Sequence, residues 1–370
     1  MTMIPIFNPY LNGNEEKYLI DCIRSEWISA RGPFVTKFES SFAEYIGSEH
    51  SIAASNCTTA LHLALKSLGI GPGDEVICPA LTFISPIHMV ALSGASPVLV
   101  DIEEDSWNLS PAKIKEAITE RTKAILVVHS FGHAARMDEI SDIAREKGLF
   151  VIEDVAEALG GTFQGKMLGS FGDISCFSFF ANKMLTCGEG GMALTRQKPL
   201  FEKMASLREY GRSVDEKYLY DDLGYNYRMT NMQAAIGFAQ LEKFEEILEI
   251  REAQYATYVN SLGESPHFAI RPRLDWGGSI HWFMTVKISK PGIRDELIRN
   301  LLAKDIELRK MIYPVYHSLP YSGLGNSSSF PISEEVSLNS VHLPSSTELS
   351  EADVSHVAKA FVAELTALSE

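Results

Sequence analysis

The 370-residue sequence has few of the features that mark secreted, metal-binding or nucleic-acid-binding proteins. It contains only five cysteines, widely spread and without a Cys-x-x-Cys pair, so neither a disulfide framework nor a zinc site is predicted. Lys and Arg total 33 against 48 Asp and Glu, and this net charge of −15 argues against a uniformly basic surface for nucleic acid. Neither a signal peptide nor an apolar run long enough for a membrane span is visible. We therefore expect a cytoplasmic protein.

The rest of the composition is that of a globular enzyme. Hydrophobic residues make up 45% and charged residues 22%, which excludes a disordered or collagen-like chain. The length predicts two domains. Because the pattern of helix and strand signals changes along the chain, we place a large domain over residues 1–250 and a smaller one over residues 251–370.

The first 250 residues alternate between helical and strand-like segments. The strand-like runs are nearly continuous in apolar residues, as expected of strands buried on both faces of a parallel sheet. They are Val76–Cys78 and the runs that end before Asp101, His129 and Asp154. Helices are predicted around 34–45, from Ser110 onward and over Met137–Lys147, the last of them ending at Gly148. Such alternation predicts an α/β fold with helices on both sides of the sheet.

The last third of the chain has a weaker pattern. A long helix is predicted to run from about Ile236 to Arg251, after the segment GYNYRMTN at 224–231. A strand over His281–Ile288 and a helix over Glu296–Lys304 follow. We expect these elements to form a smaller α+β domain.

Several common ligand motifs are absent or incomplete. No G-x-G-x-x-G lies between a strand and a helix, so a dinucleotide site of that kind has no support. The string GGTFQGKM at Gly160–Met167 approaches a phosphate loop, but Met167 stands where a Ser or Thr is required and no helical pattern follows. His129 and His133 are four residues apart but lie at a strand end, so they lack the helical geometry of a metal pair.

Two residues together indicate pyridoxal phosphate chemistry. Asp154 ends a buried strand, and ligands of open α/β sheets bind beyond the carboxyl ends of the strands. Lys183 lies downstream among aromatic and small residues, which favour a neutral, nucleophilic amine. This cofactor needs a lysine for a Schiff base and a carboxylate that keeps its pyridine nitrogen protonated. Taken singly, either residue could instead be a solvated side chain or a helix cap.

The cofactor also needs a phosphate site and a partner for its ring. The segment 55–65 leaves a short strand and enters a helix near Thr58, and a helix N-terminus binds phosphate well. The alternative is a plain helix cap by Thr58 or Thr59. Phe83 follows the next strand and could cover one face of the ring, or it could be a core aromatic.

Four motifs of the chain resemble one enzyme family. They are GIGPGDEVICPALTF, VIEDVAEALG, SFFANKMLTCGEGGM and GYNYRMTNMQAAIG. On these residues the chain resembles the StrS/DegT-type pyridoxal phosphate-dependent sugar-nucleotide aminotransferases, over nearly its whole length. The resemblance implies the aspartate-aminotransferase-like architecture, fold type I, with a large α/β domain around a mostly parallel sheet and a smaller C-terminal α+β domain.

The resemblance also implies roles for individual residues. Lys183 would hold the cofactor and then shuttle a proton between Cα of the donor and C4′ of the cofactor. Asp154 would pair with the pyridine nitrogen, and Phe83 would stack on the ring. Further cofactor contacts would be Cys57, Thr58 and Ser178 at the phosphate, Glu157 near the phenolic oxygen and Asn226 from the neighbouring subunit. The substrate side would include Trp27, Asn182, Arg228, Tyr313 and Tyr316.

The implied reaction transfers an amino group from L-glutamate to a nucleotide-linked keto sugar in a homodimer with shared active sites. The resemblance is strongest to the branch that acts on GDP-linked 4-keto-6-deoxymannose and forms GDP-perosamine, a sugar of lipopolysaccharide O-antigen biosynthesis. A lysine at position 183, where a dehydrating branch has His, favours amino transfer. A UDP- or TDP-linked 4-keto or 3-keto sugar, a free amino acid substrate, and a non-catalytic ligand-binding or regulatory role remain alternatives.

Overall fold

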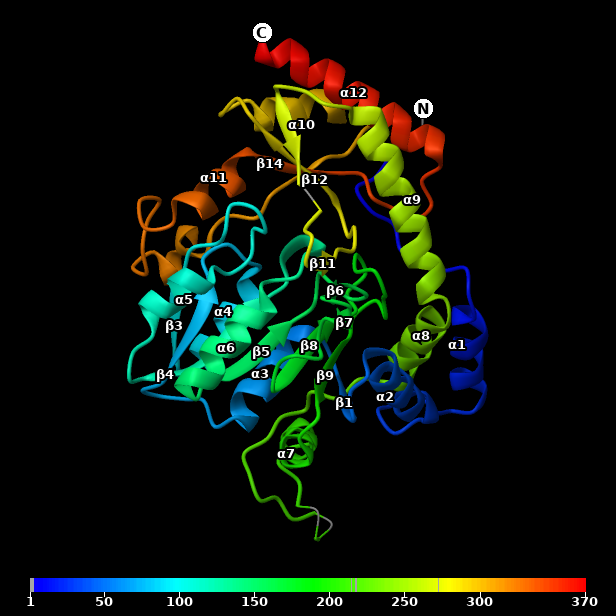
Figure 1. The fold of residues 1–370 in the computed structure, drawn as a ribbon. Helices are drawn as coiled ribbons and strands as arrows, with labels where there is room; N and C mark the ends of the chain where they lie inside the picture. The colour runs from blue at the N-terminus through cyan, green and yellow to red at the C-terminus, as the bar shows by residue number, and fades with distance from the viewer. Residues whose placement is uncertain (1–2, 214, 217, 272) are drawn as a thin grey trace.

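The computed structural model describes residues 3–213, 215–216, 218–271 and 273–370, and its largest sheet has seven strands in the order β1-β9-β8-β5-β4-β2-β3 (Figure 1). Only β9 runs against its neighbours, so the sheet is mostly parallel, as predicted. The strands are β1 (His50–Ala54), β2 (Glu75–Pro79), β3 (Ser96–Val100), β4 (Thr122–Val128), β5 (Phe150–Asp154), β8 (Ile174–Ser178) and β9 (Gly191–Thr195).

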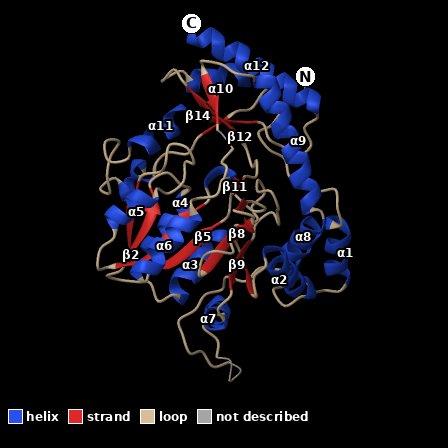
Figure 2. Cartoon of the chain, in the orientation of Figure 1, coloured by secondary structure: helices blue, strands red, loops and turns tan. Residues whose placement is uncertain are grey.

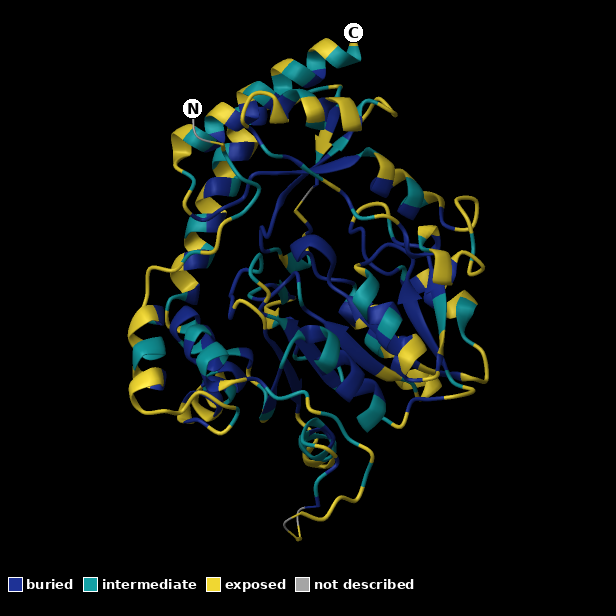
Figure 3. Cartoon of the chain, turned by 180° about the vertical axis from the view of Figure 1, so that it is seen from behind, coloured by how far each residue is buried: buried dark blue, intermediate teal, exposed yellow. Residues whose placement is uncertain are grey.

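Helices cover both faces of this sheet (Figure 2). Along β4, Ile125 and Val127 pack into one core, while Leu126 and Val128 pack into the other. This division explains why the strand is apolar without alternation. One face carries α3 (Cys57–Ser67), α4 (Ile84–Leu92) and α7 (Lys198–Arg208). The other carries α2 (Pro33–Ile46), α5 (Pro111–Ala117), α6 (Met137–Lys147) and α8 (Asn231–Glu242), with α1 (Glu15–Arg24) packed against α8. The predicted fold class is confirmed, and the sheet is buried between its helices (Figure 3).

A second sheet, in the order β10-β12-β14-β13, lies above the first in Figure 1. Its strands are β10 (Phe268–Ile270), β12 (Met284–Ile288), β13 (Arg309–Lys310) and β14 (Ser340–Leu343). Its core is shared with α9 (Phe244–Leu262), α10 (Arg294–Leu302) and α12 (Glu351–Ser369), while α11 (Pro331–Asn339) leads into β14. The N-terminal segment joins this unit, because Ile4 bridges to Ile306. The predicted division at residue 250 falls inside α9 and stays a prediction. In the described part of the chain, no helix has the length and apolar character needed to cross a membrane.

The predicted long helix is in fact two helices. Its course breaks at Lys243, which ends α8 and precedes α9 with φ −116° and ψ 11°. The two helices have different partners: α8 packs against α1 and α2, whereas α9 packs against α12. Because the chain changes direction at Lys243, the apolar residues before it pack against α1 and α2, and those after it pack against α12.

The predicted strand over His281–Ile288 is shorter, because β12 begins at Met284. The carbonyl groups of His281 and Trp282, ahead of this strand, do not join the sheet. The buried Arg251 guanidinium takes them instead: its Nε donates to the His281 oxygen at 3.1 Å and its Nη2 to the Trp282 oxygen at 2.6 Å. Trp282 therefore lies ahead of β12 rather than within it.

The string that resembles a phosphate loop forms a hairpin. Gln164 and Gly165 both have positive φ, at 48° and 78°, and they join β6 (Thr162–Phe163) to β7 (Lys166–Met167). A two-residue turn with both φ positive favours a hairpin. No helix begins there, so the phosphate-loop similarity is coincidental. β6 also pairs with β11 (Gly277–Gly278).

Candidate active site

A pocket with a volume of about 370 Å³ lies between the two sheets. Its floor is made at the carboxyl ends of the parallel strands, where α/β proteins bind their ligands. Its second wall comes from the smaller sheet and the residues that lead into it. The floor includes Cys57, Thr58, Phe83, Asp154, Glu157, Ser178, Asn182 and Lys183, and the second wall includes Trp282, Phe283, Arg309 and His342. The structure therefore brings together eight of the residues named from the sequence.

Lys183 lies at the centre of this pocket. Its Nζ is 3.9 Å from Glu157 Oε1 and 3.8 Å from the centre of the Trp282 ring. Burial lowers the pKa of the Lys183 amine, while the carboxylates of Glu157 and Asp154 act in the opposite direction. A lowered pKa makes the neutral, nucleophilic amine more available at a given pH. The environment expected from the flanking sequence is thus present.

Asp154 is a buried carboxyl without a cationic hydrogen-bond partner among the described residues. Oδ1 accepts a hydrogen bond from the Ala156 N–H at 3.0 Å, and the Cys57 thiol lies 4.0 Å away. Burial raises the pKa of Asp154 to about 6, because the charged form is poorly solvated there. A protonated ring nitrogen would provide the partner that this carboxyl lacks.

The start of α3 forms a cradle of backbone donors. The N-cap residue is Asn56, whose side chain accepts from the Thr59 N–H, while the Thr59 hydroxyl completes the capping box. The alternative of a cap by Thr58 is therefore wrong, and Thr59 caps only in reciprocal fashion. The N–H groups of Cys57 and Thr58 have no hydrogen-bond partner among the described residues and lie at the positive end of the helix dipole. Such a terminus suits a phosphate.

Gly191 on β9 lets this cradle form. A Cβ at this position would lie 2.3 Å from the Asn56 carbonyl carbon and 2.5 Å from the Cys57 nitrogen. Any side chain would thus push the start of α3 away from the sheet. This close approach explains why the glycine-rich segment after Lys183 has a glycine at position 191.

Phe83 is not a core aromatic. Its side chain is 55% exposed although it lines the pocket, and it precedes α4. Nearby, the Thr58 hydroxyl lies 2.6 Å from the Ser85 hydroxyl. An accessible ring that lines the same pocket as the start of α3 and Asp154 fits a planar aromatic cofactor.

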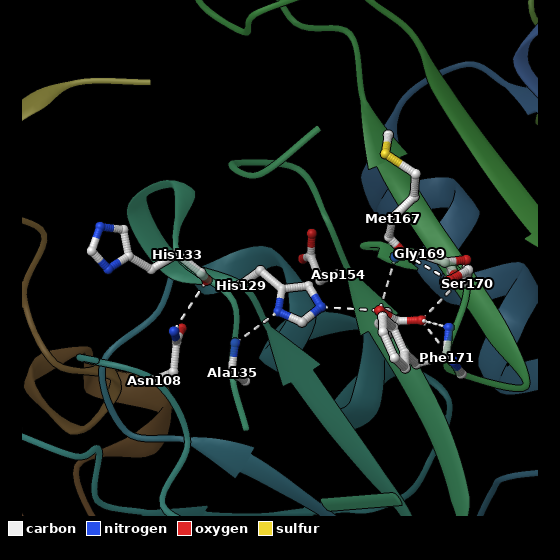
Figure 4. A network of polar contacts seen from close by, with 12 residues as sticks. Asn108, His129, His133, Ala135, Asp154, Met167, Gly169, Ser170 and Phe171 are labelled. Carbon is white, nitrogen blue, oxygen red and sulfur yellow. Dashed lines mark hydrogen bonds and ion pairs between the residues drawn. The ribbon is translucent and has the colours of Figure 1, made fainter. Parts of the chain in front are cut away.

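Behind the pocket, Glu153 and His129 form a buried polar network (Figure 4). His129 Nε2 lies 3.0 Å from Glu153 Oε2, while its Nδ1 accepts from the Ala135 N–H. Because Nδ1 accepts, Nε2 carries the proton and donates to Glu153. Glu153 also accepts from the backbone N–H groups of Gly169, Phe171 and Gly172. His129 is thus committed to a carboxylate, and the described residues form no cluster of three or more groups for a metal.

Five residues named from the sequence lie outside this pocket. Asn226 is exposed, accepts from Arg228 Nε at 2.9 Å, and bridges through its backbone to Glu209 just after α7. Trp27 and Tyr313 are 48% and 45% exposed. Tyr316 is buried and donates its hydroxyl hydrogen to Glu334. Their predicted contacts with cofactor or substrate stay predictions.

The second wall was not predicted. Trp282, Arg309 and His342 lie about 100 or more residues beyond Lys183 in the sequence, and no spacing connects them to it. The available signal was the aromatic pair Trp282–Phe283 at the start of the predicted strand.

Comparison with known proteins identifies the family. Residues 9–362 match the DegT/DnrJ/EryC1/StrS aminotransferase family. The chain belongs to this family. It is 43% identical to the GDP-perosamine synthase of Caulobacter vibrioides, over 96% of each chain. It is 40% identical to the GDP-perosamine synthase of Escherichia coli O157:H7, over 96% of this chain and 97% of that one. Spr1654 of Streptococcus pneumoniae in its PMP form matches with a TM-score of 0.94 and 26% identity, over 99% of each chain.

As a DegT-family member the chain is an aminotransferase, and aminotransferases of this family depend on pyridoxal phosphate. The pocket fits that cofactor on grounds of its own. It offers backbone N–H groups without a partner among the described residues at the start of α3, an exposed ring at Phe83, a buried carboxyl at Asp154 and an amine at Lys183.

Proposed function

We propose that this chain transfers an amino group from L-glutamate to GDP-linked 4-keto-6-deoxymannose and forms GDP-perosamine. The observation that carries the proposal is the convergence of Lys183, Asp154 and the α3 cradle in one pocket of a DegT-family chain. The GDP-linked substrate is supported by two relatives named GDP-perosamine synthase, which match nearly the full length at 40–43% identity.

In this proposal the floor of the pocket holds the cofactor. Bound pyridoxal phosphate would supply an electron sink that makes the hydrogen on the donor's Cα acidic. The N–H groups of Cys57 and Thr58, with the hydroxyls of Thr58 and Ser178, would bind its phosphate. Phe83 would cover one face of the ring, Asp154 would accept a hydrogen bond from the protonated ring nitrogen, and Glu157 would lie on the side of the phenolic oxygen.

Lys183 has two roles. Its Nζ would hold the cofactor covalently before the donor binds. The freed amine then takes the proton from Cα of the donor, and in the second half of the reaction it returns a proton to the sugar carbon that receives nitrogen. Burial lowers the pKa of the Lys183 amine, which makes its neutral, proton-accepting form more available.

The remaining residues would act at the substrate side or across a homodimer. Asn182 lines the pocket, and we propose that it contacts substrate together with Trp27, Arg228, Tyr313 and Tyr316. Because Asn226 lies outside the pocket of its own chain, we propose that it completes the phosphate site of a partner subunit. A cytoplasmic location and a role in O-antigen biosynthesis belong to the same proposal.

A panel of sugar nucleotides tests the substrate. The chain is incubated with L-glutamate and GDP-, UDP- or TDP-linked 4-keto and 3-keto sugars, and 2-oxoglutarate is measured. We expect product with the GDP-linked 4-keto-6-deoxymannose. If only UDP- or TDP-linked sugars react, the perosamine assignment is wrong while the family activity stands.

A further inference from the structure

Phe131 has a backbone conformation that needs support from its surroundings. It lies in the loop after β4, and its φ and ψ of 55° and 30° fall in the left-handed region, which is uncommon for a bulky residue. Its N–H donates to Glu157 Oε2 at 2.9 Å, and both residues line the pocket. Strained backbone gathers at functional sites, where neighbouring contacts hold it in place. The contacts that hold Phe131 therefore also act on Glu157.

The first of these contacts comes from the smaller sheet. Arg271 directly follows β10, is 5% exposed, and donates from Nη1 to the carbonyl oxygens of Ser130 at 3.0 Å and Phe131 at 3.4 Å. Its Nη2 donates to the carbonyl oxygen of Ser106, which precedes a second residue with positive φ, Trp107 at 54°. Its Cζ lies 5.8 Å and 5.0 Å from the ring centres of Phe131 and Trp107. Arg271 thus ties two strained positions of the larger domain to the smaller one.

A second contact holds the next residue of the loop. Gly132 has a φ of 88°, and its carbonyl oxygen accepts from the Ile280 N–H at 3.0 Å. A Cβ at Gly132 would lie 2.1 Å from the Ile280 carbonyl oxygen, so the two backbones are in close contact. Ile280 lies in the segment that leads into β12. The loop is therefore held by two separate contacts, and with it the direction of the Phe131 N–H.

The carboxylate that Phe131 holds faces Lys183. Glu157 is 8% exposed, and its Oε1 lies 3.9 Å from Lys183 Nζ. A hydrogen bond between an ammonium and a carboxylate is about 2.7–2.9 Å long, so this pair stops short of contact. Burial lowers the pKa of the Lys183 amine, Glu157 and then Asp154 act in the opposite direction, and Arg309 adds to the lowering. A carboxylate in direct contact with the ammonium would oppose burial more strongly and leave less neutral amine.

We propose that Arg271 is a positioning residue, which acts through the Phe131 N–H to hold the Glu157 carboxylate short of contact with Lys183. This inference rests on the proposed function, in which Lys183 needs a neutral amine to hold the cofactor and to take the donor's proton. Arg271 is not among the residues that line the pocket, so its effect on the amine passes through the loop. Without this restraint the carboxylate is free to turn toward Nζ, and a direct ion pair favours the ammonium form.

The reactivity of the Lys183 amine tests this restraint without the cofactor. The full chain, freed of cofactor, is treated with trace acetic anhydride at a series of pH values, and acetylation of each lysine is measured by mass spectrometry. Only the neutral amine reacts, and Lys287, which pairs with Glu335 outside the pocket, is the internal reference. Arg271→Lys keeps the positive charge but loses the planar fork that reaches three carbonyl groups. In this variant, acetylation of Lys183 at pH 7 should fall about 3- to 10-fold, because an opposite charge moves into contact with the amine.

Glu157→Gln separates the restraint from the charge of Arg271. By itself, Glu157→Gln should increase acetylation of Lys183 at pH 7, because it removes a negative charge beside the amine. Adding Arg271→Lys to Glu157→Gln should change the rate no further, because substitutions along one chain of contacts are not additive. No fall in Arg271→Lys, or an equal fall with and without Glu157→Gln, would overturn the proposal.

A matched arginine and a second loop variant complete the test. Arg294 is 6% exposed and its Nη1 donates to the Ser337 carbonyl oxygen, outside the pocket, so Arg294→Lys should leave acetylation of Lys183 unchanged. Thermal unfolding shows whether each variant is folded. If Arg271→Lys does not fold, Phe131→Gly carries the test, because glycine leaves the left-handed region freely and the ring contact with Arg271 is lost. Acetylation of Lys183 should again fall, and an unchanged rate would overturn the proposal.

Failure of the proposed function has a different signature. In that case the cofactor-loaded wild type would form no amino sugar from glutamate and the GDP-linked keto sugar, while the acetylation rates would still test the restraint. If the wild type forms the amino sugar and Arg271→Lys leaves acetylation of Lys183 unchanged, the proposed function stands and the role of Arg271 is wrong.

Discussion

Lys183 Nζ lies 3.8 Å from the centre of the Trp282 indole ring, although Lys183 follows β8 of the larger sheet and Trp282 precedes β12 of the smaller one. The indole N–H donates to the Asn182 carbonyl oxygen at 2.6 Å, which fixes the ring beside the lysine. Trp282 thus closes the pocket from the side of the smaller sheet. It also supplies part of the burial that lowers the pKa of Lys183.

Replacing Trp282 should change the pH at which Lys183 reacts. Trp282→Ala admits water and should raise the pKa of the amine, because burial is the largest cause of its depression. Loss of the attraction between ring and ammonium acts oppositely, by about 0.5–2 kcal/mol. The measurement is the pH profile of covalent pyridoxal phosphate uptake by the cofactor-free chain, which should move to higher pH. Trp282→Phe keeps a ring and should move it less. A shift to lower pH would show that the ring attraction outweighs burial.

Lys183→Ala should abolish turnover. The variant loses both the covalent attachment and the proton carrier, and general acid–base catalysis alone is worth about 10²–10⁴-fold. Release of 2-oxoglutarate and formation of the amino sugar are measured with saturating cofactor. The control is Lys287→Ala, which removes a lysine of β12 that pairs with Glu335 outside the pocket. Turnover at the wild-type rate without Lys183 would rule out its catalytic role.

The cofactor-free chain should become more stable when Asp154 is made neutral. The folded pKa of Asp154 is about 6, above its ordinary value of 3.8, so the folded state binds the proton more tightly than the unfolded state. The charged carboxyl therefore costs the folded state about 2–3 kcal/mol above pH 6, and the cost fades as the pH falls toward 4. In urea denaturation, the free energy of unfolding of Asp154→Asn should exceed that of the wild type at pH 7. Near pH 4 the two free energies should be equal. The same variant should bind pyridoxal phosphate less productively, because its amide cannot stabilise a charged ring nitrogen.

The floor of the pocket could be predicted from sequence because each part is local. Asp154 ends a continuous apolar strand, and the start of α3 follows another, so strand periodicity alone places both at one edge of the sheet. Lys183 could not be placed against Asp154 by spacing alone; the family resemblance supplied that step.

The second wall depends on long-range packing instead. Trp282 lies ahead of β12, where Arg251, on a helix 30 residues earlier, accounts for the His281 and Trp282 carbonyls, and no local sequence pattern shows this contact. The break at Lys243 similarly follows from two helices with different packing partners. Phe83 was predicted to stack on the ring, with a core position as the alternative, and its 55% exposure excludes the core position.

Glu153 should be essential for stability. Its buried carboxylate accepts three backbone N–H groups and the His129 ring, and these contacts hold its pKa below the ordinary value in spite of burial. Glu153→Gln places an amide N–H₂ group opposite backbone N–H groups that need an acceptor. We expect this substitution to destabilise the fold by about 3–5 kcal/mol at pH 7. A depressed folded pKa gives stability that is present above the unfolded value of 4.5 and lost as the pH falls through the folded one, so the difference should shrink in acid. Urea denaturation measures it, with the exposed Glu49→Gln as control. A loss below 1 kcal/mol would contradict this account.

Mixed dimers should recover activity if Asn226 serves the partner's site. Lys183→Ala and Asn226→Ala are each expected to be poorly active alone. When the two variants are unfolded, mixed equally and refolded, about half of the dimers are hybrids. In each hybrid, one site combines an intact Lys183 with an intact Asn226 from the other chain, so about a quarter of wild-type activity should return. If Asn226 acted within its own chain, both sites of every hybrid would carry one defect and none would return. Refolded wild type sets the scale, and full activity in Asn226→Ala by itself would remove this residue from the site.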